Sequence, residues 1–189
     1  MGFQQSVVLG SCSFILGMVF VCQVVDIPLL YMPVTTEALE NAYKFYEMWW
    51  EAPAAVKALF HGALGLPLIM LLVKLHQWNE SAMFFDGSCI AMHMATIILY
   101  LTVHINSLRT FLPESSTSAT YSLLPTPHPR LSPPTENERA EAVRVLAAAN
   151  ALVGLLAIGV MGMQIGQEYA KRVEEREESE MEKRAKKDI

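Results

Sequence analysis

Four side chains able to carry protons or bind metals line one face of the third apolar segment. Asp86, His93, Tyr100 and His104, which we call the His/Asp stripe, follow one another at intervals of 7, 7 and 4 residues. These intervals place all four within about 40° of one another on an α-helix. Ionisable groups inside a membrane mark functional sites by default. A small transporter or membrane enzyme that uses the stripe is one hypothesis, and neutral hydrogen bonding across helices is the alternative.

The spacing of the stripe argues against a metal site. His93 and His104 lie about 16 Å apart along a helix, whereas metal ligands must converge on one ion. His61, on the second apolar segment, could meet the stripe from a neighbouring helix. The sequence holds no HExxH, GxxxxGK[ST] or GxSxG motif, so we predict a protein that is not an enzyme and has no metal or cofactor. The cysteines lie in apolar runs without CxxC spacing and predict no disulfide or zinc site: Cys12, Cys22 and Cys89.

Four apolar segments must position these side chains, and each is long enough to cross a bilayer. They cover residues 6–25, 54–75, 87–108 and 145–166. About 20 helical residues span a hydrocarbon core of about 30 Å. A soluble protein with four helices that are apolar on every side would leave almost nothing to face water. We therefore predict an all-α polytopic membrane protein whose membrane domain covers residues 1–166.

The composition supports this fold class. The chain of 189 residues is 52% hydrophobic and 17% charged, and 15 of its 33 charged residues fall in the tail, residues 167–189. No Lys or Arg precedes Lys44, so the first segment lacks the basic start of a signal peptide and is expected to remain as a membrane helix. Lys57 and Lys74 flank the second segment, where their long stems could reach the headgroups. The net charge of −5 argues against a nucleic-acid partner.

The stretches between the apolar segments, and the tail, differ in composition and in the structure that they predict. Residues 26–53 contain an amphipathic helix, with Thr36 as its expected N-cap and with an aromatic face that would lie on the bundle or on the membrane surface. Residues 109–138 are rich in Pro, Ser and Thr and read as disordered, up to a capping sequence that begins at Thr135. In the tail, opposite charges three and four residues apart predict a solvated helix that continues the fourth segment.

Polar and small residues in the fourth segment predict contacts between helices. Asn150 could bond to a neighbouring helix, and Gly162 and Gly166 have the small-xxx-small spacing of close helix packing. Ser6, Gly10, Ser13 and Gly17 share a face of the first segment in the same way. Such faces could serve packing within the chain or capture of another protein's helices.

The end of the sequence predicts where the protein resides. Lys187 and Lys186 are the third and fourth residues counted from the C-terminus, which is the pattern of a dilysine signal for retrieval from the Golgi to the endoplasmic reticulum (ER) by the COPI coat. A basic end to a charged helix is the alternative. The signal acts only in the cytosol, so with four spans both termini would be cytosolic, and residues 26–53 and 109–138 would be lumenal. Eight Lys and Arg would then be cytosolic and six lumenal, a weak agreement with the positive-inside rule. The one N-x-S/T sequence begins at Asn79 and would stay unmodified.

The layout resembles that of the fungal ER-membrane packaging chaperones of amino-acid permeases. The resemblance rests on four membrane helices, a charged tail and these sequence patterns: Phe45-Tyr46 through Ala52-Pro53, Phe85-Asp86-Gly87-Ser88, Ala148-Ala149-Asn150 and Gln164-Ile165-Gly166. It implies an ER-resident membrane chaperone that keeps new permeases from aggregating and helps to package them into transport vesicles. It further implies permeases as partners, with COPII coat components at the tail. The long insert at residues 109–138 and the short tail depart from the family pattern.

Overall fold

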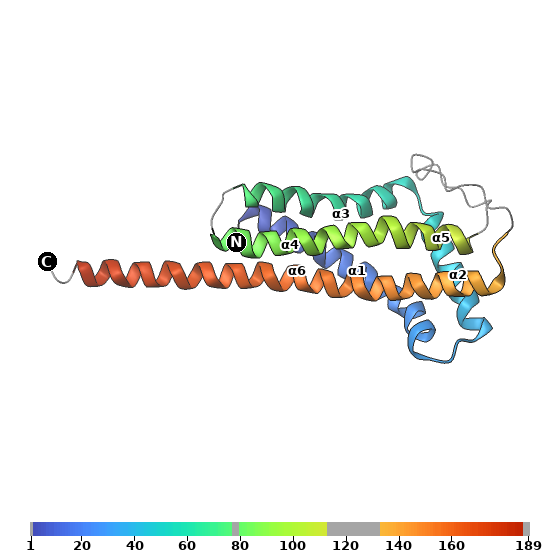
Figure 1. Cartoon of the computed structure of the whole chain (residues 1–189). Coiled ribbons are helices and arrows are strands. Elements are labelled where there is room, and N and C mark those ends of the chain that lie inside the picture. Colours follow the sequence, from blue (N-terminus) through green and yellow to red (C-terminus); the bar gives the residue numbers. More distant parts are fainter. Residues whose placement is uncertain (1, 77–79, 113–132, 187–189) are drawn as a thin grey trace.

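The computed structural model describes residues 2–76, 80–112 and 133–186, and every regular element in that part of the chain is helical. Four long helices lie side by side, and a shorter one crosses one end of the bundle (Figure 1). The elements are α1 (Phe3–Tyr31), α2 (Thr36–Trp50), α3 (Ala54–Leu75), α4 (Glu80–Leu99), η1 (Tyr100–His104), α5 (Ile105–Phe111) and α6 (Glu136–Ala185).

The long helices form a bundle in which each packs on two others. Helix α6 packs against α1 and α4, and α3 packs against the same two helices from the other side. Within the described residues, four helical stretches are long and apolar enough to span a membrane: Phe3–Tyr31, Ala54–Leu75, Met83–Phe111 and Glu136–Ala185. The prediction of an all-α polytopic membrane protein is therefore confirmed.

Several helices extend beyond the segments that hydropathy delimits. Helix α1 continues past Val25 to Tyr31 and includes Pro28, so Asp26 lies inside the helix and is not the start of a loop. The third segment continues as one helical stretch through η1, a π-helical turn in which the Ile105 N–H bonds to the Tyr100 carbonyl oxygen. Only helix α3 coincides with its predicted range.

Helix α2 closes one end of the bundle. The aromatic residues recur at helical spacing, so they face the bundle, where Tyr46 and Trp50 are buried in a cluster with Phe111 and Leu146. The amphipathic helix is thus confirmed, and its aromatic face packs on the bundle. The N-cap is Thr35 rather than Thr36, because the Thr35 hydroxyl accepts a hydrogen bond from the Ala38 N–H.

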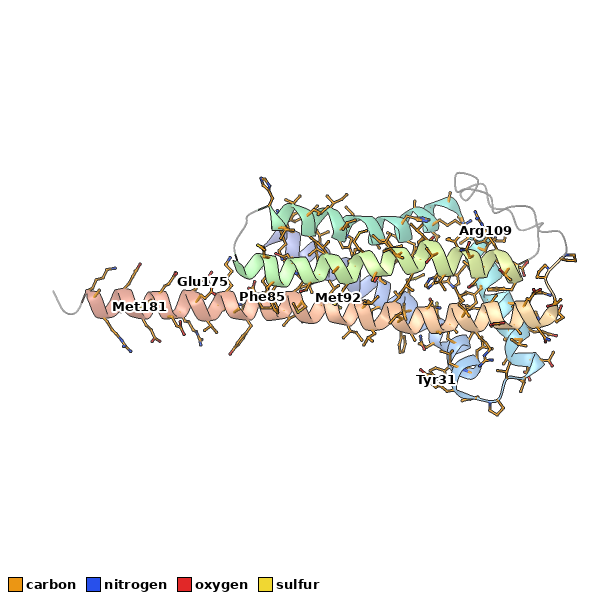
Figure 2. The ribbon with its side chains drawn as sticks, in the orientation of Figure 1. Tyr31, Phe85, Met92, Arg109, Glu175 and Met181 are labelled. Carbon is orange, nitrogen blue, oxygen red and sulfur yellow. The ribbon has the colours of Figure 1, made fainter. Side chains whose placement is uncertain are left out.

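Helix α6 is the longest element, with 50 residues and a length of about 75 Å. Thr135 and Glu138 form the predicted capping box at its start. The helix leaves the bundle without a break near Gly166, and residues 171–186 are exposed. Figure 2 shows the side chains of this part, Glu175 and Met181 among them, standing away from the bundle. The tail is therefore a helical extension of the fourth segment, as its charge spacing predicted.

Candidate functional site

Two buried polar clusters occupy opposite ends of the bundle. The first lies where α2 meets the bundle and consists of Asp26, Tyr46, Asn150 and His104; we call it the Asp26 cluster. The Asp26 carboxylate is 0% exposed and accepts hydrogen bonds from the Tyr46 hydroxyl at 2.5 Å and the Asn150 amide at 2.9 Å. The Asn150 amide nitrogen is also 2.8 Å from the Tyr46 hydroxyl oxygen.

The bonds to Asp26 fix the orientation of the other groups in this cluster. Because the Asn150 amide nitrogen donates toward Asp26, the amide oxygen faces His104 Nε2 at 3.0 Å and accepts a hydrogen bond from its N–H group. Burial, together with the Asp26 carboxylate, raises the pKa of Tyr46 above its ordinary range, so this hydroxyl remains a donor. The cluster therefore joins α1, α2, η1 and α6 through one continuous set of hydrogen bonds.

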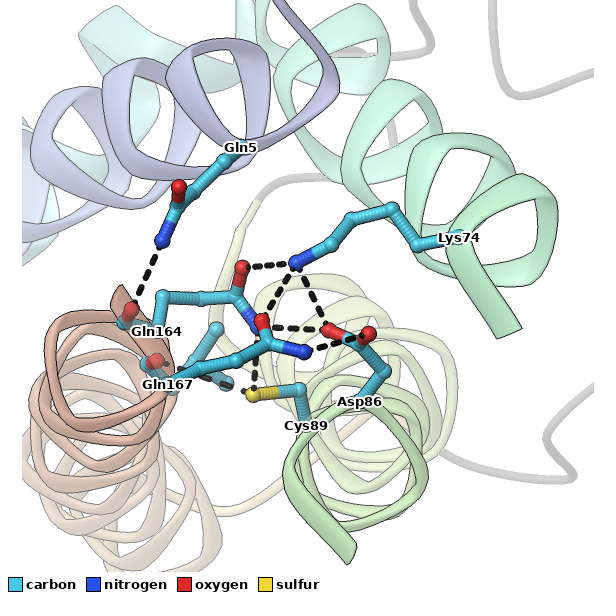
Figure 3. Close-up of polar contacts among 7 residues, drawn as sticks. Gln5, Lys74, Asp86, Cys89, Gln164 and Gln167 are labelled. Atoms are coloured by element: carbon cyan, nitrogen blue, oxygen red, sulfur yellow. Dashed lines mark hydrogen bonds and ion pairs between the residues drawn. The ribbon is translucent and has the colours of Figure 1, made fainter. Parts of the chain in front are cut away.

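The second cluster lies near the point where the tail leaves the bundle, and Figure 3 shows its contacts. We call it the Lys74–Asp86 cluster. The Lys74 ammonium is 2.8 Å from an oxygen of Asp86, and it donates to the side-chain oxygens of Gln164 and Gln167 at 2.6 and 2.7 Å. Both glutamines return a hydrogen bond from their amide nitrogens to Asp86 at 2.9 Å. Lys74 and Asp86 therefore neutralise each other's charge, and the two glutamine amides provide further hydrogen-bond partners for both.

Further bonds attach this cluster to α1. The Gln5 amide donates to the Gln164 carbonyl oxygen at 2.7 Å, and the Gln164 amide approaches Cys89 Sγ at 3.3 Å. The expectation for Lys74 is corrected here. Its side chain is only 13% exposed and its ammonium pairs with the buried Asp86 carboxylate, so Lys74 points into the bundle and does not extend to the headgroups. Lys57, at 6% exposed, is likewise buried.

The His/Asp stripe faces the interior, but its members bond to different neighbours. Asp86 belongs to one cluster and His104 to the other. Between them, His93 Nε2 is 2.7 Å from the Leu64 carbonyl oxygen, and the Tyr100 hydroxyl is 3.0 Å from Nε2 of His61. These are bonds between helices, as the neutral interpretation of the stripe expects. No group of three His, Cys, Asp or Glu in the described ranges could hold a metal ion.

The small residues of α6 differ in what surrounds them. A Cβ on Gly166 would lie 3.3 Å from the Phe85 ring, and one on Gly154 would lie 3.2 Å from a Val19 methyl group. A Cβ on Gly162 would meet no atom within 4 Å. Gly166 therefore lies at a close contact with α4, whereas the expectation of a helix contact at Gly162 is not met within this chain, because Gly162 faces away from the other helices.

The predicted retrieval signal lies at the end of the exposed tail. Lys186 caps the C-terminus of α6, and its ammonium is 3.9 Å from Glu182. Lys187 lies outside the described residues, as do Asn79 and most of the segment 109–138. The exposure of Lys186 leaves its side chain accessible to a receptor.

The sequence patterns indicate Asn150 and His104 of the Asp26 cluster and Asp86 of the Lys74–Asp86 cluster, but not the other members. They place Asp26 in a connection, because it follows an uncharged run, and Tyr46 only in an aromatic face. They place Lys74 at the end of a membrane segment and predict no bonds for the side chains of Gln164 and Gln167. A carboxylate next to an apolar run, with an amide in another membrane segment, is a signal that could have found them, because charged groups in a membrane need partners.

A cavity of about 130 Å³ lies beside the Asp26 cluster. Its wall is formed by α1, α2, α3, η1, α5 and α6, with Tyr46, Asn150 and His104 among the lining residues. The two ends of the bundle therefore differ: a polar cluster lies at the tail end, while a largely apolar pocket lies at the end covered by α2.

A family model for SHR3 chaperones, described as ER membrane protein SH3, matches residues 1–189. Neither a curated protein nor a solved structure matches the chain.

Proposed function

This chain belongs to the SHR3 chaperone family of ER membrane proteins, and from that premise we propose that it assists newly inserted amino-acid permeases to fold and to enter vesicles that leave the ER. The observation that carries the proposal is the family match, which covers residues 1–189, and the part of the chain that the structure describes contains four candidate spans. A client of this kind needs help inside the bilayer, because polar groups of a permease helix are costly in lipid until their partners arrive.

The distribution of polar groups supports a chaperone whose outer surface contacts client helices through apolar side chains. Asp26, Asp86 and Gln164 are 0% exposed, and they bond to groups of their own chain. The outward side chains of the bundle are largely apolar, with Phe20 76% and Leu155 64% exposed. A client helix on this surface would meet apolar contacts and no free hydrogen-bonding groups of the two clusters, so it could leave again when its own partners form.

The placement of the tail belongs to the same proposal. Both termini face the cytosol, Lys186 and Lys187 engage the COPI coat for retrieval, and the charged helix beyond Gly166 offers a surface to COPII components. The support is the continuous, exposed helix over residues 171–186, which holds the chain end away from the bundle. The chaperone itself would then return to the ER while its clients travel on.

Removing the protein from a cell tests the role in permease export. We expect amino-acid permeases to accumulate in the ER of the deletion strain while bulk secretion continues, and the full chain to restore delivery. Crosslinking in mild detergent should capture newly made permeases with the tagged chain, and a soluble secreted protein is the negative control. Normal permease delivery in the deletion strain would refute the proposal.

Two changes test the orientation and the signal. Replacing Lys186 and Lys187 with Ser should move a fraction of the protein from the ER to the Golgi, as followed by microscopy. The same replacement at Lys171 and Lys183 is the matched control and should leave the protein in the ER. A glycan on Asn79 would place the short connection before α4 in the lumen and contradict cytosolic termini.

A further inference from the structure

Both ring nitrogens of His104 face oxygen atoms. Nε2 is 3.0 Å from the side-chain oxygen of Asn150, and Nδ1 is 3.1 Å from the carbonyl oxygen of Leu99. A backbone carbonyl oxygen can only accept a hydrogen bond, so the contact with Leu99 requires a hydrogen on Nδ1. Whether Nε2 also carries a hydrogen depends on which end of the Asn150 amide faces it.

The bonds around Asp26 fix the orientation of that amide. Three contacts join the Asp26 carboxylate, the Tyr46 hydroxyl and the Asn150 side chain to one another. With the amide nitrogen toward Asp26, the hydroxyl hydrogen and the two amide hydrogens supply one donor to each contact. With the amide reversed, all three contacts would join oxygen atoms, and even a protonated Asp26 would leave only two hydrogens for them. The Asn150 oxygen therefore faces His104, and Nε2 needs a hydrogen as well.

A histidine ring with a hydrogen on each nitrogen is a cation. A charged group inside a membrane pairs with another group, and Tyr46 and Asn150, which bond to the Asp26 carboxylate, are neutral. His104 acts on that carboxylate electrostatically from the other side of Asn150. Hydrogen bonding and charge balance therefore both favour an imidazolium at His104.

The other titratable groups around His104 supply no competing anion. Those that line the pocket under α2 together with His104 are Cys22 of α1, Tyr46 of α2, Lys57 and His61 of α3, and Tyr100 of η1. None of these five side chains is ordinarily negative at neutral pH. Lys57 would oppose a second cation, but the exposed Glu51 carboxylate acts on it electrostatically. The Asp26 carboxylate is therefore the anion that a charged His104 would neutralise.

Two other histidines of the bundle have contacts that a neutral ring satisfies. His61 Nδ1 is 2.6 Å from the Lys57 carbonyl oxygen, but its Nε2 faces the Tyr100 hydroxyl at 3.0 Å, and a hydroxyl can donate. His93 Nε2 is 2.7 Å from the Leu64 carbonyl oxygen, which requires one ring hydrogen. Of these three histidines, His104 is the one whose two nitrogens both face an acceptor.

We propose that His104 is positively charged at neutral pH and forms an ion pair with Asp26 through the Asn150 amide, so that the docking of α2 depends on a proton. Helix α2 bonds to Asp26 through Tyr46. If His104 loses one ring proton, Asp26 loses its counter-charge and the contact with Leu99 loses its hydrogen, so α2 should be held less firmly. His104 is only partly buried, whereas Asp26 is 0% exposed, so the pair exchanges its proton through the imidazole.

Nuclear magnetic resonance of the full chain in detergent, with ¹⁵N-labelled histidine, tests the charge directly. A neutral ring has one protonated and one bare nitrogen with widely separated ¹⁵N shifts, whereas an imidazolium has two protonated nitrogens with similar shifts. At neutral pH we expect the imidazolium pattern for His104 and the neutral pattern for His61 and His93. His104→Gln identifies the His104 signals by their loss. A bare ring nitrogen in His104 at neutral pH would overturn the proposal.

A change of the carboxylate tests the pairing. Asp26→Asn keeps the shape of the side chain and removes its charge, so His104 should show the neutral pattern at the same pH. Glu51→Gln removes an exposed carboxylate at the same end of the bundle and is the matched control, which should leave His104 charged. A charged His104 in Asp26→Asn would contradict the ion pair. If Asp26→Asn fails to fold, the spectrum of the unaltered chain still decides, because it needs no variant.

The link to α2 is tested by hydrogen exchange of its backbone amides as the pH is raised, with amides of α3 as the reference. After correction for the intrinsic pH dependence of exchange, protection of α2 should fall about tenfold at the pH where the spectra show the proton leaving, because a hydrogen bond from a charged group is lost. His104→Gln should abolish this step. Unchanged protection of α2 across that pH would overturn the link. None of these measurements involves a permease, so their failure leaves the proposed chaperone role to its own tests.

Discussion

Both ends of the bundle bury an aspartate carboxylate, but they stabilise it with different groups. Each buries an aspartate at 0% exposure, and each uses an amide of α6 to reach it, Asn150 at one end and Gln164 at the other. Asp86 has a cation, Lys74, at 2.8 Å, whereas Asp26 accepts its hydrogen bonds from a hydroxyl and an amide. The tail end therefore depends on direct charge neutralisation, and the α2 end on hydrogen bonds and aromatic packing.

The difference matters because α2 is a smaller element than the spans it covers. It has 15 residues, and its attachment combines the Tyr46–Asp26 bond with aromatic contacts to Phe111. At the tail end, α1, α3, α4 and α6 all contribute to one cluster. We expect the tail end to contribute more to the stability of the bundle than the α2 end. Three substitutions and one truncation test that difference, in order of expected effect.

The largest loss should follow from removing the cation at the tail end. Lys74→Met leaves the buried Asp86 carboxylate without its counter-ion, which costs about 3–5 kcal/mol of unfolding free energy. Denaturant titration in detergent, followed by circular dichroism, measures this loss. The double variant Lys74→Met with Asp86→Asn should recover much of the stability, because it removes the unpaired charge. A loss no larger than that of Lys171→Met, on the exposed tail, would contradict the central role of this ion pair.

A smaller loss should follow from removing the hydroxyl at the α2 end. Tyr46→Phe deletes the bond to the Asp26 carboxylate, and a hydrogen bond to a charged group contributes about 1.5–3 kcal/mol. The same titration measures it, and limited proteolysis should cut first near α2. Tyr43→Phe is the control and should cost almost nothing, because its hydroxyl has no partner. Equal losses in the two variants would show that the Asp26 bond adds no stability.

A larger side chain at Gly154 should weaken the packing of α6 on α1 without altering either polar cluster. Gly154→Leu would force a side chain against Val19, since even a Cβ there lies 3.2 Å from its methyl group. Overpacking costs about 1–3 kcal/mol. Gly162→Leu, where a Cβ meets no atom within 4 Å, should be neutral or stabilising in the same unfolding titration. A larger loss for Gly162→Leu would mean that this face contacts something that the single chain does not include.

The smallest effect should come from the tail. Residues 171–186 are exposed, and exposed ion pairs such as Lys171–Glu175 add little to stability. Truncation after Ala170 should therefore leave the unfolding midpoint of the bundle unchanged while it removes the proposed retrieval signal. A lowered midpoint in the truncated chain would show that the tail folds back onto the bundle.

Much of the fold could be predicted because it depends on local patterns. The range of α3 follows from an apolar run that begins after Pro53, and the start of α6 follows from the Thr135 capping box. The aromatic face of α2 was also predictable, since helical periodicity places Tyr46 and Trp50 together. The two polar clusters were harder to predict from the sequence. Hydropathy places Asp26 and Lys74 at the water-facing ends of segments, where neither side chain would need a partner.

The sequence by itself determined the class of the protein: four apolar spans, an amphipathic helix, a charged helical tail and the family to which they belong. Spans and tail follow from the transfer free energy of each side chain and from spacing along one helix. Only the tertiary structure decided that Asp26 bonds to Tyr46, that Lys74 neutralises Asp86, and that a cavity remains under α2. The two polar contacts join residues of different helices, 20 positions apart for Asp26 and Tyr46 and 12 for Lys74 and Asp86, and their energies depend on distances between helices, which no local pattern contains.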